Sequence, residues 1–215
     1  MQIKTPTMLL CFDDCYIDEW YNHLQFFDDH NMRVSFYVTK IRDIRSVNHG
    51  WDKLREIKAR GHTIGYHGMG HLRAGACVAD MGCAAFLAQE IQPGLRILKE
   101  EGFDNIHHYC YPKGNRTEAS DRCLWKTFRT LRRGGRPFSF SAEQIREERL
   151  LGTKHFAKGI DGVDEGYKKL IKGAIQNNRI ICGYMHYPMP RRLAMLASFK
   201  QLHFLPMSVL DGGTQ

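Results

Sequence analysis

Short apolar runs alternate with longer segments of helical spacing along almost the whole chain. The short runs are rich in Val, Ile, Phe and Tyr, a composition that is typical of buried strands. This pattern predicts strands at 7–12, 33–38, 62–66, 106–111, 150–156 and 179–185, with a last short strand at 203–205.

The longer segments repeat their apolar positions every three or four residues, which is typical of helices that cover a sheet. We predict helices at 17–30, 51–60, 83–101, 118–133, 163–177 and 193–200. Glycines follow three of these segments, and Pro93 should kink or split the helix at 83–101. Strands that alternate with such helices indicate parallel strands joined by crossovers, in a small closed barrel or an open sheet.

Length and composition fit one soluble domain that covers residues 1–215, because 43% of the residues are hydrophobic and 25% are charged. No apolar run approaches the ~18 residues that span a bilayer, and no secretory signal precedes the first strand. Seven cysteines occur without a Cys-x-x-Cys spacing. We therefore expect reduced thiols and a cytoplasmic protein.

The formal net charge of +8 has two interpretations, a solvated basic surface or a surface that meets an anionic substrate or an anionic membrane face. The basic residues concentrate between Lys126 and Arg136. No basic stripe is interleaved with aromatic residues, so we expect no nucleic-acid partner.

Two carboxylates, Asp13 and Asp14, end the first predicted strand, and His67 and His71 follow the third. Each pair alone is common, as a solvated turn or a chance spacing. Their context is more informative, because chemistry gathers at the carboxyl ends of parallel strands. There, one carboxylate and two imidazoles could bind a divalent metal, while the second carboxylate acts as a base.

Two later segments add to this pattern. Tyr109-Cys110-Tyr111-Pro112-Lys113-Gly114 is a strand end with a tight turn, and the strand at 179–185 ends at His186. Alone, His186 is more often a packed histidine than a catalytic one. The glycines between 65 and 70 do not form a dinucleotide-binding motif, since Arg73 stands at the position of the third glycine.

In this order the motifs resemble those of the polysaccharide deacetylase family (carbohydrate esterase family 4, the NodB homology domain) over about residues 8–210. The resemblance implies an irregular (β/α) barrel of about seven parallel strands. It also implies one divalent metal on Asp14, His67 and His71, with Asp13 as general base and His186 as general acid. One oxygen and two nitrogens suit zinc, and cobalt, nickel or iron are alternatives. The substrate-binding turn would comprise Tyr111, Pro112 and Lys113, with a backbone N–H near Lys113 holding the oxyanion.

The chain departs from the family pattern at three positions. Cys110 stands where the family often has an arginine that orients the catalytic aspartate, and Lys113 stands where it has an aromatic residue. Gly68 replaces a Ser or Thr that braces the metal loop. We expect Arg116 to orient Asp13 instead. Candidates for the aspartate that supports the acid histidine are Asp161 and Asp164.

These observations predict a metal-dependent hydrolase that removes an acetyl or formyl group from an amino sugar. Without an export signal, the expected substrate is a nucleotide- or lipid-linked intermediate of lipopolysaccharide or capsule biosynthesis, carried on a phosphate, with peripheral membrane contact. Two alternatives stay open: hydrolysis of a non-sugar amide of the cyclic ureide type, and a metal-binding pseudoenzyme with a regulatory role.

Overall fold

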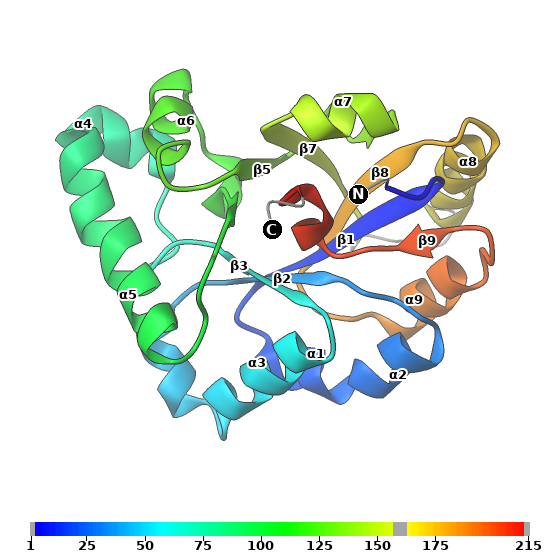
Figure 1. The fold of residues 1–215 in the computed structure, drawn as a ribbon, viewed down its shortest axis with the longest axis horizontal. Coiled ribbons are helices and arrows are strands. Elements are labelled where there is room, and N and C mark those ends of the chain that lie inside the picture. Colours follow the sequence, from blue (N-terminus) through cyan, green and yellow to red (C-terminus); the bar gives the residue numbers. More distant parts are fainter. Residues whose placement is uncertain (1–2, 157–162, 213–215) are drawn as a thin grey trace.

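Seven parallel strands close into a barrel in the computed structural model, which describes residues 3–156 and 163–212 (Figure 1). Each strand pairs with the next along the chain, and the last pairs with the first. In barrel order they are β1 (Thr7–Asp14), β2 (Ser35–Val38), β3 (Thr63–Tyr66), β4 (His108–Cys110), β5 (Thr130–Gly134), β7 (Leu150–His155) and β8 (Ile180–Met185). The predicted irregular barrel of about seven parallel strands is therefore confirmed.

Two short strands extend the barrel wall. β6 (Ser139–Phe140) pairs antiparallel with β8, and β9 (His203–Phe204) runs parallel to β1. Helices surround the barrel in Figure 1. They are α1 (Ile17–Asn22), α2 (Leu24–Asp29), α3 (Gly50–Ala59), α4 (Ala74–Phe86), α5 (Gln92–Glu100), α6 (Glu118–Leu124), α7 (Ala142–Glu147), α8 (Val163–Gln176) and α9 (Pro190–Ala197).

Strand β1 is buried on both faces, which explains its continuous apolar run. Successive side chains of a strand point to opposite faces. Met8, Leu10 and Phe12 pack in the layer between barrel and helices, whereas Leu9 and Cys11 pack inside the barrel. Asp13 continues the inward-facing row. The same alternation delivers polar side chains from the other strands to the carboxyl end of the barrel interior.

The amino end of the barrel is covered by the segment Met207–Leu210, a short 3-10 helix at the centre of Figure 1. Met207 and Leu210 pack with the side chains of the barrel interior. The backbone N–H of Met207 donates to Ser35 Oγ at 2.8 Å, and that of Ser208 donates to Thr63 Oγ1 at 3.1 Å. Both hydroxyls belong to the first residue of a barrel strand, so this end is closed and the opposite end carries the chemistry.

The helix predicted at 118–133 is wrong in its second half. Helix α6 ends at Leu124, and residues 130–134 form β5. Leu131 packs outward, while Arg132 points into the barrel with only 1% of its surface exposed. Arginine favours helices in isolation, but here an ion pair inside the barrel outweighs that preference. The helix predicted at 17–30 is also divided, into α1 and α2, at His23.

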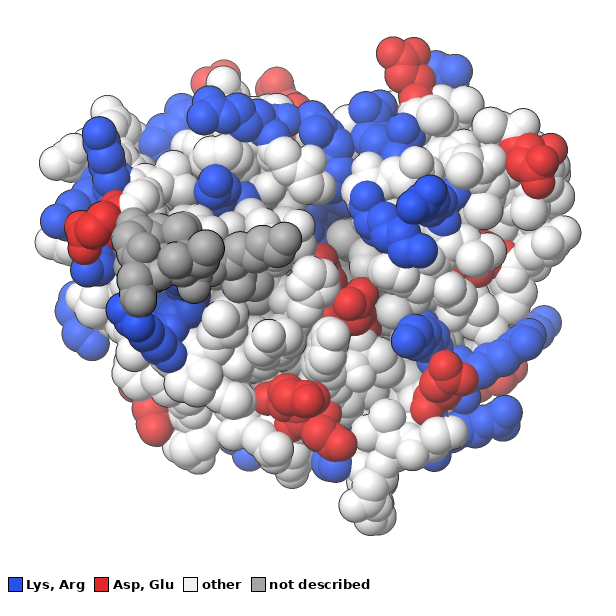
Figure 2. All heavy atoms as spheres, turned by 180° about the vertical axis from the view of Figure 1, so that it is seen from behind, with Lys and Arg blue, Asp and Glu red and all other residues white. Residues whose placement is uncertain are grey.

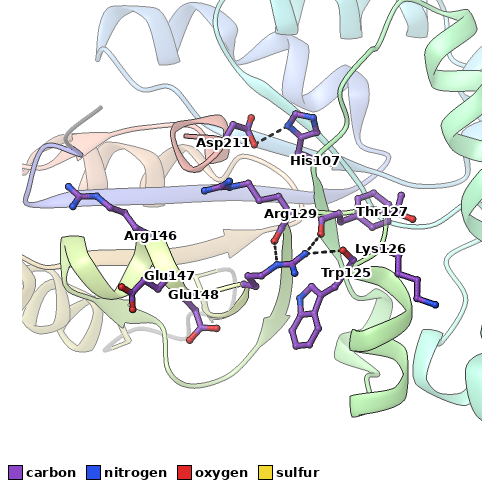
Figure 3. A pocket seen from close by; sticks show the side chains of 11 residues that line it. His107, Trp125, Lys126, Thr127, Arg129, Arg146, Glu147, Glu148 and Asp211 are labelled. Atoms are coloured by element: carbon purple, nitrogen blue, oxygen red, sulfur yellow. Dashed lines mark hydrogen bonds and ion pairs between the residues drawn. The ribbon is translucent and has the colours of Figure 1, made fainter. Parts of the chain in front are cut away.

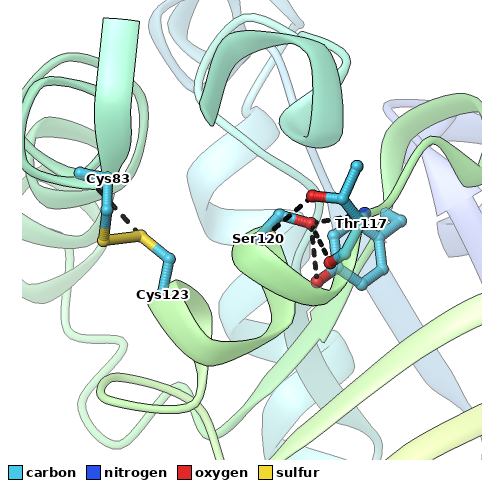
Figure 4. Close-up of a disulfide and its surroundings, with 5 residues drawn as sticks. Cys83, Thr117, Ser120 and Cys123 are labelled. Carbon is cyan, nitrogen blue, oxygen red and sulfur yellow. Dashed lines mark hydrogen bonds between the residues drawn. A yellow bond between two sulfur atoms is a disulfide. The ribbon is translucent and has the colours of Figure 1, made fainter. Parts of the chain in front are cut away.

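The expectation of seven reduced thiols is wrong. Cys83 on α4 and Cys123 on α6 form a disulfide, with 5.7 Å between their Cα atoms (Figure 4). The two residues are 40 positions apart on different helices, so sequence spacing gave no sign of the pairing. Disulfides are typical of oxidising compartments, and the thiol-based support for a cytoplasmic location is lost. The location itself stays a prediction.

One helical stretch in the described part of the chain, Ala74–Glu100, has the length and apolar composition of a membrane span. Its backbone leaves the helical conformation at Gly82, where φ is 81°. The stretch then passes through a π-helical turn at Leu87–Ile91 before α5. Because Phe86, Ile91 and Leu98 are buried in the layer around the barrel, we interpret this stretch as a covering layer of the fold.

His62 should make the stability of this fold depend on pH. It is buried, accepts the Val34 N–H at Nδ1 at 3.1 Å and packs against Phe27 and Phe36. Burial, with Arg33 nearby, lowers its pKa from 6.5 to about 4. Between pH 6.5 and pH 4 the unfolded chain therefore binds a proton at His62 that the folded chain excludes. The folded state consequently loses stability as the pH falls from 6.5 towards 4.

His62→Asn keeps an acceptor near the Nδ1 position and removes the titration. Relative to this variant, the free energy of unfolding of the wild type should fall by at most about 3 kcal/mol between pH 7 and pH 4. Urea unfolding at several pH values measures the difference. A constant difference between the two proteins would contradict this role of His62.

Candidate active site

The side chains predicted at the strand ends meet in one cavity of about 210 Å³ at the carboxyl end of the barrel. Its walls include Asp13 and Asp14 from β1, His67 and His71 from the loop after β3, and His186 after β8. The remaining lining residues are Cys110, Tyr111, Lys113, Gly114, Arg132, Gly134 and Tyr184. Residues separated by more than 170 positions thus share one site because the barrel closes.

Asp14, His67 and His71 are arranged as ligands of a single cation. The Nε2 atoms of His67 and His71 lie 3.4 and 3.3 Å from Asp14 Oδ1. Ligands bound at 2.0–2.2 Å in a tetrahedral site lie about 3.3–3.6 Å apart. Burial acts to raise the pKa of Asp14, but the two histidines hold that pKa well below its usual range. The carboxylate is therefore ionised and available to a metal.

The orientation of His67 supports the same interpretation. Its Nδ1 lies 2.8 Å from the carbonyl oxygen of Cys110, which can only accept, so Nδ1 carries the proton. When no metal is bound, a protonated Nε2 can donate to Asp14 Oδ1, and this contact lowers the pKa of Asp14. When a metal is bound, Nε2 gives up that proton to coordinate the cation, while the Cys110 carbonyl keeps the ring oriented.

Asp13, His67 and Cys110 form a second group of potential ligands that shares His67. Burial raises the pKa of the Cys110 thiol well above its usual value, and metals bind the thiolate. Arg132 Nη2 also lies 2.7 Å from Cys110 Sγ. A fixed guanidinium beside the sulfur disfavours a cation there, so the set with Asp14 is the better metal site.

Arg132, rather than Arg116, holds the Asp13 carboxylate. Its Nη2 forms an ion pair with Asp13 Oδ1, and both side chains are buried. The guanidinium also donates to Thr153 Oγ1 at 3.3 Å. It lies over the ring of Tyr37, with 4.6 Å between its Cζ atom and the ring centroid. These contacts fix the carboxylate that was predicted to be the base.

The prediction for Arg116 is wrong, because that side chain pairs with Asp121. In the β4–β5 register Cys110 lies directly opposite Arg132. The arginine that holds Asp13 thus lies one strand away from the position expected from the family pattern, and the small thiol of Cys110 leaves space for it. The sequence Thr130-Leu131-Arg132 alternates polar and apolar residues, which is typical of a strand. The surrounding run of basic residues instead favoured the interpretation as a solvated helix face.

Buried Glu90 braces the metal loop where a hydroxyl was expected beside the first histidine. Its Oε1 accepts the backbone N–H of Gly70 at 2.9 Å and of Leu72 at 3.3 Å. Gly68 has a φ of +83°, and a Cβ at this position would lie 2.6 Å from the same oxygen. Thr39 Oγ1 donates to the Gly68 carbonyl at 2.9 Å. Glycine is therefore required at position 68 by the group that braces the loop.

His186 follows β8, the strand that pairs with β1, and its side chain faces Asp14. Its Nε2 lies 3.9 Å from Asp14 Oδ2, and its side chain is about one third exposed. The rings of His155 and Tyr184 approach it edge-on, with centroids 5.5 and 5.9 Å away. Asp161 and the side chain of Asp164, the proposed supports of this histidine, lie outside the described residues.

The predicted substrate-binding turn is divided between the interior and the surface. Tyr111 and Pro112 are buried, and the Tyr111 hydroxyl donates to Asp121 Oδ1 at 2.7 Å. Lys113 is exposed at the mouth of the cavity with a positive φ of 57°. The hydroxyl of Tyr111 is thus committed to the α6 helix, and Lys113 is the member of the turn that meets solvent.

A second cavity, of about 540 Å³, lies at the amino end of the barrel (Figure 3). His107, Arg129 and Arg149 line it directly before β4, β5 and β7. Arg149 donates to three backbone carbonyls, and His107 pairs with Asp211 at 3.1 Å. The opposite face of the molecule also carries many Lys and Arg side chains (Figure 2). The basic residues are therefore distributed over both ends.

One family model matches more than half of the chain. Residues 2–127 match the family model described as polysaccharide deacetylase. No curated protein sequence matches the chain.

Several solved structures share the fold. The chitin deacetylase of the fungal pathogen Colletotrichum lindemuthianum is 12% identical, with a TM-score of 0.60 over 97% of this chain and 89% of that one. The catalytic domain of a peptidoglycan N-acetylglucosamine deacetylase from Eubacterium rectale is 14% identical, with a TM-score of 0.59 over 98% and 92%. A mutant of a carbohydrate esterase family 4 pseudoenzyme, with restored activity, is 11% identical, with a TM-score of 0.59 over 98% and 68%.

The ligand set predicts that the purified protein binds about one divalent metal per chain. His71→Asn should lose most of it, because Asn tolerates the φ of 61° at this position but is a poorer ligand than imidazole. Metal analysis after dialysis against zinc measures the content, with His203→Ala, at the exposed position of β9, as matched control. Equal metal in wild type and His71→Asn would place the metal elsewhere.

The buried ion pair predicts strong coupling between Asp13 and Arg132. Arg132→Met should lower the free energy of unfolding at pH 7 by about 3–5 kcal/mol, because it leaves a buried carboxylate unpaired. The double variant Arg132→Met/Asp13→Asn should lose about 1 kcal/mol less free energy of unfolding than the losses of the two single variants added together. Urea unfolding of the four proteins measures the coupling. Additive effects would show that the two side chains do not stabilise each other.

Proposed function

The chain belongs to the polysaccharide deacetylase family, and from that premise we propose that it is a metal-dependent hydrolase of N-acylated amino sugars. The observation that carries this proposal is the juxtaposition of an intact metal set with two further proton-transfer groups. Asp14, His67 and His71 form the metal set, Asp13 precedes Asp14 on β1, and His186 Nε2 lies 3.9 Å from Asp14 Oδ2.

Asp14, His67 and His71 would hold the metal, for which zinc is the best match to one oxygen and two nitrogens. When bound, such a metal lowers the pKa of water and polarises an acyl carbonyl. The residues around it supply the proton transfers. Asp13, oriented by Arg132, would accept a proton from the attacking water. The exposed turn at Lys113 would offer a backbone N–H to the developing oxyanion.

His186 would protonate the departing amine. An amine is a poor leaving group unless it is protonated, so an acid must face the scissile bond from the side opposite the base. His186 is partly exposed at the rim, where the leaving sugar would lie. The volume of about 210 Å³ suits a small acyl group such as acetyl or formyl, since pockets that bury whole ligands usually exceed ~300 Å³.

Two settings are possible for the sugar. The net charge of +8 supports a phosphate-bearing carrier, as in a nucleotide- or lipid-linked precursor of lipopolysaccharide or capsule in the cytoplasm. The Cys83–Cys123 disulfide instead favours an oxidising compartment, where the acylated sugars belong to an assembled glycan. We favour an enzyme over the pseudoenzyme alternative, because Arg132 and Glu90 make the orienting and bracing contacts that Cys110 and Gly68 cannot make.

The proposed roles predict different losses in two variants. Asp13→Asn should lower the turnover of an N-acetylated chito-oligosaccharide by about 10²-fold or more, because the base is lost. His186→Ala should lower amide turnover strongly, yet keep a larger fraction of its activity on an activated acetate ester, whose leaving group needs little protonation. Acetate release and chromogenic ester assays measure both.

His203→Ala serves again as control in these assays and should behave as the wild type. If His186→Ala lost amide and ester activity equally, the residue would have a positioning role rather than that of an acid. A wild type that releases no acetate from any acylated amino sugar would contradict the proposed function.

A further inference from the structure

Large exposed apolar side chains occur next in sequence to active-site residues at the carboxyl end of the barrel. Among the described residues four such side chains occur, and their exposed fractions are 37–46%. Tyr16, Leu72 and Tyr187 lie within two residues of the site residues Asp14, His71 and His186, and Met81 is the exception. Isolated exposed apolar residues need no explanation, but such a group beside an active site is typical of a binding surface.

Tyr16 and Tyr187 are in contact with each other although they are 171 positions apart. Their ring centroids are 5.5 Å apart, and the rings meet edge-on at 62°. They are 37% and 46% exposed, so the remaining ring surface is open to solvent. One tyrosine follows the metal ligand of β1, and the other follows the predicted acid after β8. The pair therefore lies beside the ends of the paired strands β1 and β8, next to Asp14 and His186.

Trp20 fixes the two segments that carry these tyrosines. It is fully buried, its backbone N–H donates to the carbonyl oxygen of Tyr16 at 2.9 Å, and its indole N–H donates to that of His186 at 2.8 Å. A single core residue thus ties the start of α1 to the segment after β8. The aromatic pair is held in place before any ligand binds, which reduces the entropy that binding must overcome.

We propose that Tyr16 and Tyr187 form a stacking platform for the sugar ring whose acyl group enters the cavity; this inference rests on the proposed function. A cavity of about 210 Å³ admits the acyl group but leaves the ring outside. The face of a pyranose ring presents C–H groups that pack on aromatic rings, while its hydroxyls stay at the edge. The platform lies where that ring would emerge, so it selects a pyranose amide over a small amide without an apolar face.

The test separates ring binding from chemistry. Tyr16→Ala and Tyr187→Ala should each raise KM for an N-acetylated chito-oligosaccharide by up to about tenfold, the range of one aromatic contact. For vinyl acetate, an activated ester without any ring that could stack on the tyrosines, KM should stay unchanged. Tyr→Phe at either position should keep the platform. Met81→Ala removes a similarly exposed apolar side chain from α4, away from the site, and is the matched control.

The Asp13→Asn background gives a second readout, because turnover there is slow enough for affinity for the oligosaccharide to be measured by equilibrium binding. The double alanine variant in this background should bind the oligosaccharide at least about tenfold more weakly. An unchanged glycan KM in the double alanine variant would overturn the platform while leaving the proposed function intact. Equal losses on glycan and ester would also overturn it, since they indicate a distorted site. A wild type inactive on all acylated sugars would instead remove the function on which the platform rests.

Discussion

The ion pair between Asp13 and Arg132 inside the barrel is the interaction on which the site depends. Both side chains are almost fully buried, and the low-dielectric interior would penalise either charge alone by several kcal/mol. The pair forms only if β1, β4 and β5 are in register and the barrel is closed. Correct closure of the fold and correct orientation of the proposed base are therefore one physical requirement.

Two contacts of the site stand where the sequence departs from the family pattern. Arg132 on β5 lies directly opposite Cys110 on β4 and holds Asp13, the task that the family pattern assigns to an arginine at position 110. At the metal loop, a carboxylate from the segment before α5 replaces a hydroxyl beside His67, and Gly68 makes the space for Glu90. In both cases a small residue, Cys110 or Gly68, leaves room for a larger polar side chain from a neighbouring element. That side chain then makes the orienting or bracing contact.

The inward-facing rows of the strands were predictable where alternation was clear. Leu9, Cys11 and Asp13 on β1 continue one row, and the row of Cys182 and Tyr184 on β8 ends at His186. These strands end in polar residues, so the meeting of their ends followed from the sequence. Arg132 was not predictable in the same way, because helix propensity and a basic run obscured a five-residue strand. Glu90, the disulfide and the tyrosine pair depend on contacts between distant segments, which local patterns do not report.

Anomalous diffraction from crystals of the zinc-loaded protein would test the central claim most directly. The metal set and the ion pair together predict one zinc bound at about 2.0–2.2 Å by Asp14, His67 Nε2 and His71 Nε2. Arg132 should still hold Asp13 beside it. A zinc ion on Asp13, His67 and Cys110, with Arg132 displaced from the carboxylate, would contradict the proposed division between metal ligand and base.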